Sequence, residues 1–525
     1  MLCIGLVATV VCIGLFTAIK HPGVDNDLTQ VLTVARNIAA GDGIVTDTIY
    51  YEQHHMFDKV PAPQTVFPPG QPIAVATLLR LGFGEMTATR IVAAAGFLVL
   101  PVFLLLLCIR AGLPKATAFI VAVFWLCVVL AWYNLVNRKS DVPFIALTML
   151  SASWLARDRG SRILNSSIAG VVAGFALTIR YAGLFFMLAV GIWLLLEWLR
   201  ERSFKRFATL IGFCIPAGAT ACMFFYRNYQ LVGDIKGGNN YAEPKSVIDI
   251  IRGIYLEHTR ITGFDYDRLK VGSVAEVCLV LVVLFGAFLC FRRGVRQIVV
   301  DVVTVLRENR VALFCVIYFA VTYVMLVFLE INSQPGARHR MYMAATPFIF
   351  CLVGCLMQRT SRAPATRGFQ VWLAGLLVTF LIGQANVAQH FFGTFRHGHH
   401  WYNLVRVMDR PMGETTVGAF LREKVTREHP LMTNEPQRMG EILKRPVVGL
   451  PSPLYSATTW NDENAREVAE RFNVRYLLVL TDENSLSFEE FDYFKTIVER
   501  RKLGWAELYF ETGNVLLFRL PDKRQ

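Results

Sequence analysis

The sequence has little charge. Asp, Glu, Lys and Arg make up 18% of its 525 residues, whereas hydrophobic residues make up 54%, and the mean hydropathy is +0.43. This composition excludes an ordinary soluble enzyme, because apolar runs long enough to cross a bilayer recur along most of the chain. The net charge of +13 does not indicate a nucleic-acid partner, because most basic residues lie in short loops beside apolar segments, where they set membrane topology.

The polar C-terminal part has no cysteine. All eleven cysteines lie within or at the ends of apolar segments, so we expect no disulfide framework there. Cys351 and Cys355 are one helical turn apart, but no further Cys or His accompanies them at ligand spacing, which argues against a zinc site. The C-terminal part also lacks a phosphate-binding glycine loop and a nucleophile motif. We therefore expect it to shield a site or help choose an acceptor.

The apolar segments predict about eleven transmembrane helices. The first lacks a basic leader and a convincing small-residue cleavage site, so we interpret it as a retained membrane helix. Four basic loops lie on one side if every segment crosses, and the positive-inside rule makes that side cytoplasmic. The N-terminus is then inside and the C-terminus outside. The segments lie near 2–19, 91–109, 116–133, 142–156, 163–179, 181–199, 208–226, 274–291, 311–330, 342–357 and 371–389.

The predicted fold class is a polytopic α-helical membrane protein with a small C-terminal α/β domain. We assign residues 1–400 to the transmembrane domain and 401–525 to an extracytoplasmic domain. The first outer loop, 20–90, carries two interfacial helices separated by a proline-rich turn. In this loop and in the C-terminal domain, helices are predicted over 28–40, 72–82, 413–426, 436–444, 462–472 and 487–501, and strands over 476–480 and 515–518.

Charged residues gather at the predicted outer membrane edge. Charge near the hydrocarbon boundary is costly unless it is paired, snorkelling or functional. Snorkelling explains each residue alone, but not carboxylates and guanidinium groups that gather on one side from distant segments. The aspartates that precede the helix over 28–40 either cap it or present a catalytic carboxylate, and the sequence leaves both open. The set is Asp25, Asp27, Arg138, Lys139, Asp141, Arg180, Arg227, Arg338, His339 and Arg340.

This mixture of charges suits one reaction. A lipid-linked phosphosugar carries a phosphate near the headgroup level, where Arg can hold it in bidentate geometry. Phosphate is already a good leaving group, so its departure needs little general-acid catalysis. The acceptor hydroxyl needs a general base within hydrogen-bond reach, and a carboxylate is the usual choice. One Asp with several cations at the membrane edge would be a minimal catalytic set.

Several motifs, in order, resemble the GT-C membrane glycosyltransferases. The closest likeness is to the branch related to protein O-mannosyltransferases and lipid A aminoarabinose and galacturonate transferases. The resemblance implies a polyprenyl-phosphate-linked sugar donor, a lipid, glycan or protein acceptor, and a multi-pass location in a bacterial inner membrane. It rests on Asp27 with Ala35-Arg36-Asn37 and Gly41, on Val66-Phe67-Pro68-Pro69-Gly70-Gln71-Pro72 and Arg90, on Ser140-Asp141-Val142-Pro143-Phe144, on Arg180-Tyr181-Ala182-Gly183 and on Arg338-His339-Arg340-Met341-Tyr342.

The resemblance also implies roles for single residues. The family's catalytic base falls on Asp27, although the family usually has Asp-Glu where this chain has Asp27-Leu28, so Asp25 stays an alternative. Asp141 would orient the acceptor, bind a cation or hold a neighbouring Arg. The candidate phosphate contacts are Arg180, Arg338 and Arg340, assisted by Arg138 or Lys139, and the candidate substrate contacts are His339 and Tyr342.

Two histidine groups are candidates for a divalent metal, which the family sometimes uses. Neither group has a carboxylate or Cys at tight ligand spacing, so we expect surface histidines and no metal. The groups are His54 and His55, and His397, His399 and His400.

Two other classes of function compete with a transferase. A transporter or flippase for lipid-linked substrates would favour mid-membrane charges, broken helices and internal repeats, and the sequence shows no repeat. A scaffold protein would explain the C-terminal part but not the outer Arg and Asp residues.

Overall fold

The computed structural model divides the chain into two compact units. We call Met1–His21, Arg90–Phe224 and Pro244–Arg396 the helical unit, and Pro22–Thr89, Phe225–Glu243 and His397–Gln525 the α/β unit. The structure describes residues 26–49, 53–157, 160–235, 237–238, 245–262, 295–332, 339–360, 375, 378–385, 387–388, 399–450, 461–481 and 497–521.

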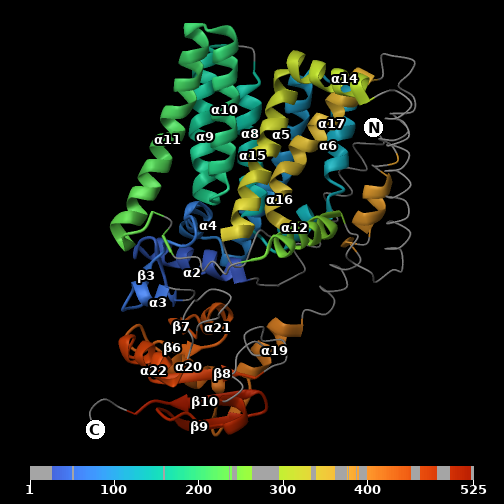
Figure 1. Ribbon diagram of the computed structural model, residues 1–525. Helices are drawn as coiled ribbons and strands as arrows, with labels where there is room; N and C mark the ends of the chain where they lie inside the picture. Colours follow the sequence, from blue (N-terminus) through green and yellow to red (C-terminus); the bar gives the residue numbers. More distant parts are fainter. Residues whose placement is uncertain are drawn as a thin grey trace. The chain divides into compact units, whose positions relative to one another are not determined.

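The helical unit is built from long apolar helices that run alongside one another (Figure 1). Within the described residues, six helices are long and apolar enough to cross a bilayer, or seven if one bent pair counts as a single span. The chain is therefore a polytopic membrane protein. The predicted segments 2–19 and 274–291, and part of 371–389, lie outside the described residues. Five of the six are α5 (Glu85–Arg110), α9 (Arg162–Ile179), α10 (Gly183–Glu201), α11 (Phe204–Val232) and α15 (Arg310–Asn332). The sixth span, Arg340–Gln358, includes most of α17 (Thr346–Thr360), and the shorter α8 (Asp141–Leu155) lies among these helices.

The apolar segment near 116–133 is broken rather than continuous. Helices α6 (Lys115–Trp125) and α7 (Val129–Val136) meet at 57°. Two side chains satisfy backbone groups at the break: the Val129 N–H donates to Oε1 of Gln384 (2.8 Å), and Nε1 of Trp132 donates to the carbonyl of Leu126 (2.6 Å). Backbone groups at membrane depth need such internal partners.

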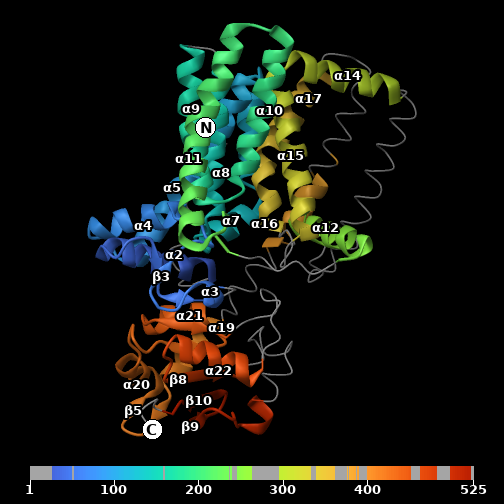
Figure 2. The same ribbon diagram turned by 60° about the vertical axis from the view of Figure 1, so that its left-hand side comes forward.

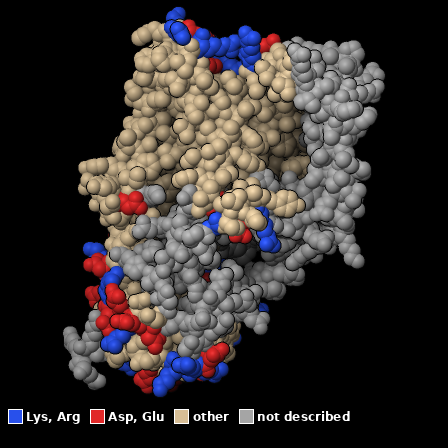
Figure 3. Space-filling view, in the orientation of Figure 1, with Lys and Arg blue, Asp and Glu red and all other residues tan. Residues whose placement is uncertain are grey.

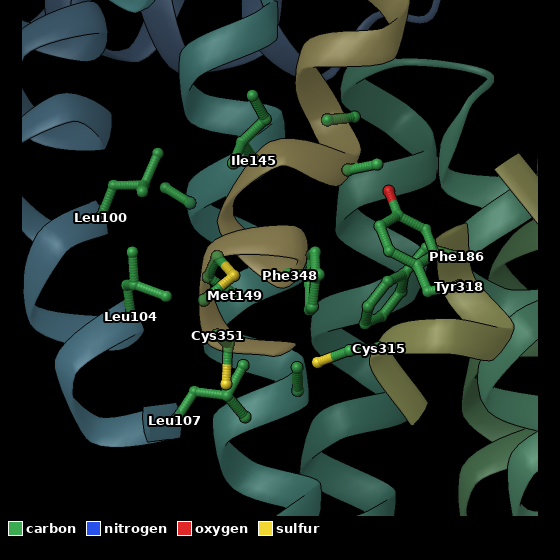
Figure 4. Packing of buried hydrophobic residues seen from close by; sticks show 14 of the residues in the cluster. Leu100, Leu104, Leu107, Ile145, Met149, Phe186, Cys315, Tyr318, Phe348 and Cys351 are labelled. Carbon is green, nitrogen blue, oxygen red and sulfur yellow. The ribbon is translucent and has the colours of Figure 1, made fainter. Parts of the chain in front are cut away.

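The core of the helical unit is closely packed and apolar. Figure 4 shows Leu100, Leu104 and Leu107 of α5 facing Ile145 and Met149 of α8. Beside them lies an aromatic cluster in which ring centroids are 4.6–6.4 Å apart, within the range of favourable aromatic pairs. It contains Phe186, Phe314, Tyr318 and Phe348.

Small residues allow α9 and α11 to approach closely. A Cβ added at Gly170 would lie 2.4 Å from the carbonyl oxygen of Phe213, and one at Gly174 would lie 2.6 Å from Oγ1 of Thr220. The two glycines are four residues apart on one face, which is the spacing typical of membrane-helix interfaces. This contact fixes the position of α9, and the C-terminal end of α9 carries Arg180.

Exposed Lys and Arg side chains crowd one end of the helical unit. In Figure 3 the face toward the viewer is apolar, and Lys and Arg side chains crowd its upper end. There Glu197 binds both Arg206 and Arg310 at 3.0 Å. Two amphipathic helices, α12 (Val247–Thr262) and α14 (Val295–Glu308), lie across opposite ends of the long helices (Figures 1 and 2). Both expose apolar side chains, as interfacial helices do.

The α/β unit contains a six-stranded sheet in the order β2-β7-β6-β8-β10-β9. The first four strands are parallel, whereas β10 is antiparallel to both of its neighbours. Helix α22 packs on one face, and α19, α20 and α21 pack on the other. The bounds are β2 (Thr48–Ile49), β6 (Leu431–Thr433), β7 (Val447–Gly449), β8 (Tyr476–Leu480), β9 (Glu507–Thr512), β10 (Val515–Arg519), α19 (His399–Met408), α20 (Val417–Lys424), α21 (Pro436–Leu443) and α22 (Asp462–Arg471).

The first outer loop belongs to the same unit. Its strand β2 pairs with β7, with Thr48 opposite Val447 and Ile49 opposite Val448. Ile49 is fully buried with side chains of the C-terminal strands. Helix α2 (Asn26–Ala40) packs against α4 (Gly70–Arg80) and α21. The remaining short elements are β1 (Val45–Thr46), α3 (Gln53–Met56), β3 (Ala62–Pro63), α16 (His339–Tyr342), the 3₁₀ helix Met343–Ala345, β4 (Pro411–Met412) and β5 (Thr415–Thr416).

Candidate functional site

The turn between α7 and α8 buries two cations. Arg138 is 1% exposed and Lys139 is 9% exposed. Arg138 adopts a left-handed backbone conformation with φ +55°, which is uncommon for a residue other than glycine and is often found at functional sites. Nζ of Lys139 lies 5.3 Å from the ring centroid of Tyr133. The structure thus places both predicted cations inside the helical unit, at the start of α8.

Asp141 and Arg180 form a buried ion pair beside this turn. Nη1 of Arg180 donates to Oδ2 of Asp141 (3.1 Å) and to Oγ of Ser140 (3.0 Å). The Asp141 side chain is 4% exposed, and its carboxylate lies in the first turn of α8, where the helix dipole favours negative charge. A buried charge needs such a partner, because desolvation of the lone ion would cost several kcal/mol.

A tight turn aims Arg180 at Asp141. The N–H of Gly183 donates to the carbonyl of Arg180 at 2.9 Å, and α10 begins at Gly183. A Cβ on Gly183 would lie 2.5 Å from Cα of Leu177. Because Cα of Leu177 is a backbone atom that cannot move aside, the turn requires glycine at this position.

A third segment, around Tyr342, joins the first two. Nδ2 of Asn134, on α7, donates to Sδ of Met343 (3.4 Å). Tyr342 is 4% exposed, and it packs with Phe185 and Tyr323, the latter ring centroid 5.5 Å away. Figure 2 shows α7 and α16 side by side at the same end of the helices. Three predicted motifs from distant parts of the chain therefore converge at this end.

Two of the predicted arginines lie in this third segment. Arg340 is half-buried on α16. Arg338 and the His339 side chain lie outside the described residues.

Asp27 lies in the α/β unit. Helix α2 begins at Asn26, so Asp27 is in its first turn and is half-buried. A carboxylate at that position is stabilised by the helix dipole. Asp25 lies outside the described residues.

A network of four charges, which the sequence did not predict, anchors α2. Arg36 forms ion pairs with Glu441 of α21 and, at 3.2 Å, with Glu85 of α5. Lys444 binds the same two carboxylates, Glu85 at 2.7 Å. Arg36 stands in one of the motifs that suggested a family, but Glu441 lies 405 residues further along the chain. No local pattern could have indicated that pair.

Comparisons with known proteins agree on the fold. No protein-family model matches the chain, and no curated protein matches it. Among solved structures, ArnT from Cupriavidus metallidurans bound to undecaprenyl phosphate has a TM-score of 0.57 and 11% identity over 98% of both chains. The apo form of that protein has a TM-score of 0.56 and 11% identity over 99% of this chain and 98% of ArnT. The arabinofuranosyltransferase AftD from Mycobacteria has a TM-score of 0.51 and 14% identity over 99% of this chain and 40% of AftD.

The chain has the GT-C fold. The ordered motifs predicted this fold, and the structural likeness confirms it. At 11% identity the likeness concerns the fold.

The histidines lie where the structure gives no side-chain positions. The side chains of His54, His55, His399 and His400, and the whole of residues 397–398, are outside the described set. Among the side chains that the structure does describe, no three His, Cys, Asp or Glu residues gather as metal ligands would.

Asp47 is a second carboxylate that the sequence did not single out. It follows α2 and accepts a hydrogen bond from Nδ2 of Asn37 (3.0 Å). Burial raises the pKa of Asp47, although this hydrogen bond and the charges of Arg427 and Arg36 oppose the rise. Ionised Asp47 is therefore a destabilising charge in the folded GT-C chain.

We expect Asp47→Asn to raise the unfolding temperature at neutral pH. The folded protein binds the Asp47 proton more tightly than the unfolded chain does, so Asp47 lowers stability as the pH rises from its ordinary pKa of 3.8 through its folded pKa. The gain should therefore vanish below pH 3.8. Thermal unfolding as a function of pH measures it, with Asp42→Asn, a more exposed carboxylate beside Arg427, as control. A lower unfolding temperature for Asp47→Asn at neutral pH would contradict the prediction.

Proposed function

We propose that this protein is an integral membrane glycosyltransferase. It moves a hexosyl or pentosyl group from a polyprenyl-phosphate donor to an acceptor hydroxyl at the extracytoplasmic face. The observation that carries the proposal is the buried Asp141–Arg180 pair beside Arg138 and Lys139 at one end of a helical bundle with the GT-C fold. A solved structure of similar fold was determined with undecaprenyl phosphate bound.

In this proposal the cations hold the donor phosphate. Arg180, Arg338 and Arg340 contact the phosphate oxygens, and Arg138 and Lys139 assist. Charge-assisted hydrogen bonds from guanidinium groups to phosphate are short and strong. Asp141 keeps Arg180 in position by the hydrogen bond to Nη1. Tyr342 and His339 contact the substrate.

Asp27 acts as the general base, with Asp25 as the alternative. The acceptor oxygen attacks the anomeric carbon while its proton passes to the carboxylate. The bond from that carbon to the phosphate oxygen breaks, and polyprenyl phosphate leaves as an anion held by the arginines. A single displacement of this kind inverts the configuration of the sugar carbon. The acceptor is a lipid, a glycan or a protein.

The proposed topology has eleven spans, with the N-terminus in the cytoplasm of a bacterial cell. The gathering of Lys and Arg at one end of the helical unit (Figure 3) supports a cytoplasmic end. The domain at 401–525 is then extracytoplasmic, together with the first outer loop, which contributes β2 to its sheet.

The reaction itself tests the proposal against a transporter. We expect the purified protein in liposomes to transfer radiolabelled sugar from a polyprenyl-phosphate donor to an acceptor extract, and to release polyprenyl phosphate in equal amount. Boiled protein and a donor carried on polyprenyl diphosphate serve as controls. Movement of the intact donor across the bilayer without sugar transfer would support a transporter instead.

A further inference from the structure

A cavity on the α/β unit has no part in the proposed transfer. Its volume is about 450 Å³, which is within the range of ligand sites. It lies between the end of α20 and the segment that joins α21 to β7. Four cations and two carboxylates line it: Arg422, Arg427, Lys444, Arg445, Asp47 and Glu423.

Two of these arginines each donate a hydrogen bond to a backbone carbonyl in the segment that carries the other. Nε of Arg445 donates to the carbonyl of Arg422 (2.9 Å), and Nη2 of Arg422 donates to the carbonyl of Ile442 (3.3 Å). In the described part of the chain, neither guanidinium has a carboxylate within ion-pair distance. Both residues are exposed, so an anion can reach them from solvent, and both positive charges would attract it.

The two carboxylates of the cavity do not neutralise this pair. Glu423 binds Lys424 at 2.7 Å, and Asp47 accepts from Asn37 and lies 3.9 Å from Arg427. Arg427 and Lys444 are engaged by other acids, Arg427 by Asp42 at 2.5 Å and Lys444 by Glu85 at 2.7 Å. These pairs therefore do not neutralise the positive charges of Arg422 and Arg445.

We propose that this cavity binds a phosphate monoester through Arg422 and Arg445. Two guanidinium forks match the oxygens of a phosphate and present parallel N–H groups that a lysine pair could not. The phosphate belongs either to a lipid headgroup or to a soluble phosphorylated sugar. The site goes beyond the proposed transfer, because its ligand is bound by the α/β unit and not by the cations proposed for the donor phosphate.

Binding to the full-length protein tests the proposal without any sugar transfer. In detergent, calorimetry would be done with mannose 6-phosphate and with mannose. Nanodiscs would compare short-chain phosphatidic acid with phosphatidylcholine of the same chain length. We expect saturable binding of at least one phosphate probe and none of the uncharged sugar. Binding of phosphatidic acid alone assigns the phosphate to a lipid, and binding of mannose 6-phosphate assigns it to a soluble sugar.

Matched variants separate the site from general electrostatics. We expect Arg422→Gln with Arg445→Gln to weaken binding by at least about tenfold, because hydrogen bonds to charged groups are the strong class. Arg466→Gln removes a cation from α22 that pairs with Glu470, and it should bind as wild type does. The double variant Arg422→Lys with Arg445→Lys keeps both positive charges, and it serves as a control for loss of binding through misfolding. Equal binding by the double Gln variant, or no phosphate binding by the wild type, would overturn the proposal.

Discussion

Replacing Asp27 with asparagine should lower the rate of sugar transfer by about 10²- to 10⁴-fold, the contribution typical of a general base. Asparagine has the same shape and still stabilises a helix start, so α2 should form as before. The lost function is proton removal from the acceptor hydroxyl. The turnover number at saturating donor should fall, while the Michaelis constant for the donor changes little.

Asp25→Asn is the matched control for this prediction. It removes a carboxylate two residues away and, if Asp27 is the base, should keep most of the turnover. Large loss in Asp25→Asn with full activity in Asp27→Asn would move the role to Asp25. Full turnover in both variants would remove both aspartates from the mechanism. Thermal unfolding of each variant shows whether the fold has been preserved.

Replacing Arg180 with glutamine should reduce both stability and donor binding. The Asp141 side chain, 4% exposed, would remain buried without its counter-ion, and such losses cost about 3–5 kcal/mol. The Michaelis constant for the donor should rise by at least about tenfold, because a charge-assisted contact to phosphate is lost.

The double variant Asp141→Asn with Arg180→Gln separates the two effects. It removes both charges, so much of the lost stability should return, as neutral replacement of buried ion pairs generally allows. Donor binding should remain weak, because neither glutamine nor asparagine carries positive charge. Donor affinity equal to that of the wild type in the double variant would mean that Arg180 only positions Asp141. Unfolding temperature and donor titration, measured on the same preparations, give both answers.

Local sequence patterns predicted several elements closely. The amphipathic spacing after Asp27 corresponds to α2, Asn26–Ala40, and the alternation near the C-terminus corresponds to β8, Tyr476–Leu480. The helix predicted over 413–426 is shorter in the structure, because Thr415–Thr416 form β5 and α20 begins at Val417. Most of the helix predicted over 487–501 lies outside the described residues. The break between α6 and α7 was not predicted, because Leu126, Cys127 and Val128 are as apolar as their neighbours. It depends on the amide of Gln384, a side chain more than 250 residues away.

The candidate site was only partly predictable. Topology placed Asp141 and Arg180 on one side of the membrane, but their direct hydrogen bond depends on how α8 and α9 pack. The left-handed backbone of Arg138 has no signal such as glycine or asparagine. Asp47 stood out in no motif, and its raised pKa arises from burial where its backbone bonds to Thr33 of α2 and to Val447 of β7.

The pairing of β2 with β7 has a consequence for biosynthesis. Nearly 400 residues separate Ile49 from its partner Val448, and a ribosome adds about 5–20 residues per second. Strand β2 therefore waits roughly 20–80 seconds after its own synthesis before its neighbour exists. Because β7 is the one strand beside β2 among the strands that the structure describes, the first outer loop completes its folding only after the last transmembrane helix has been made. A nascent chain stalled before β7 would display this strand edge to chaperones and proteases outside the ribosome.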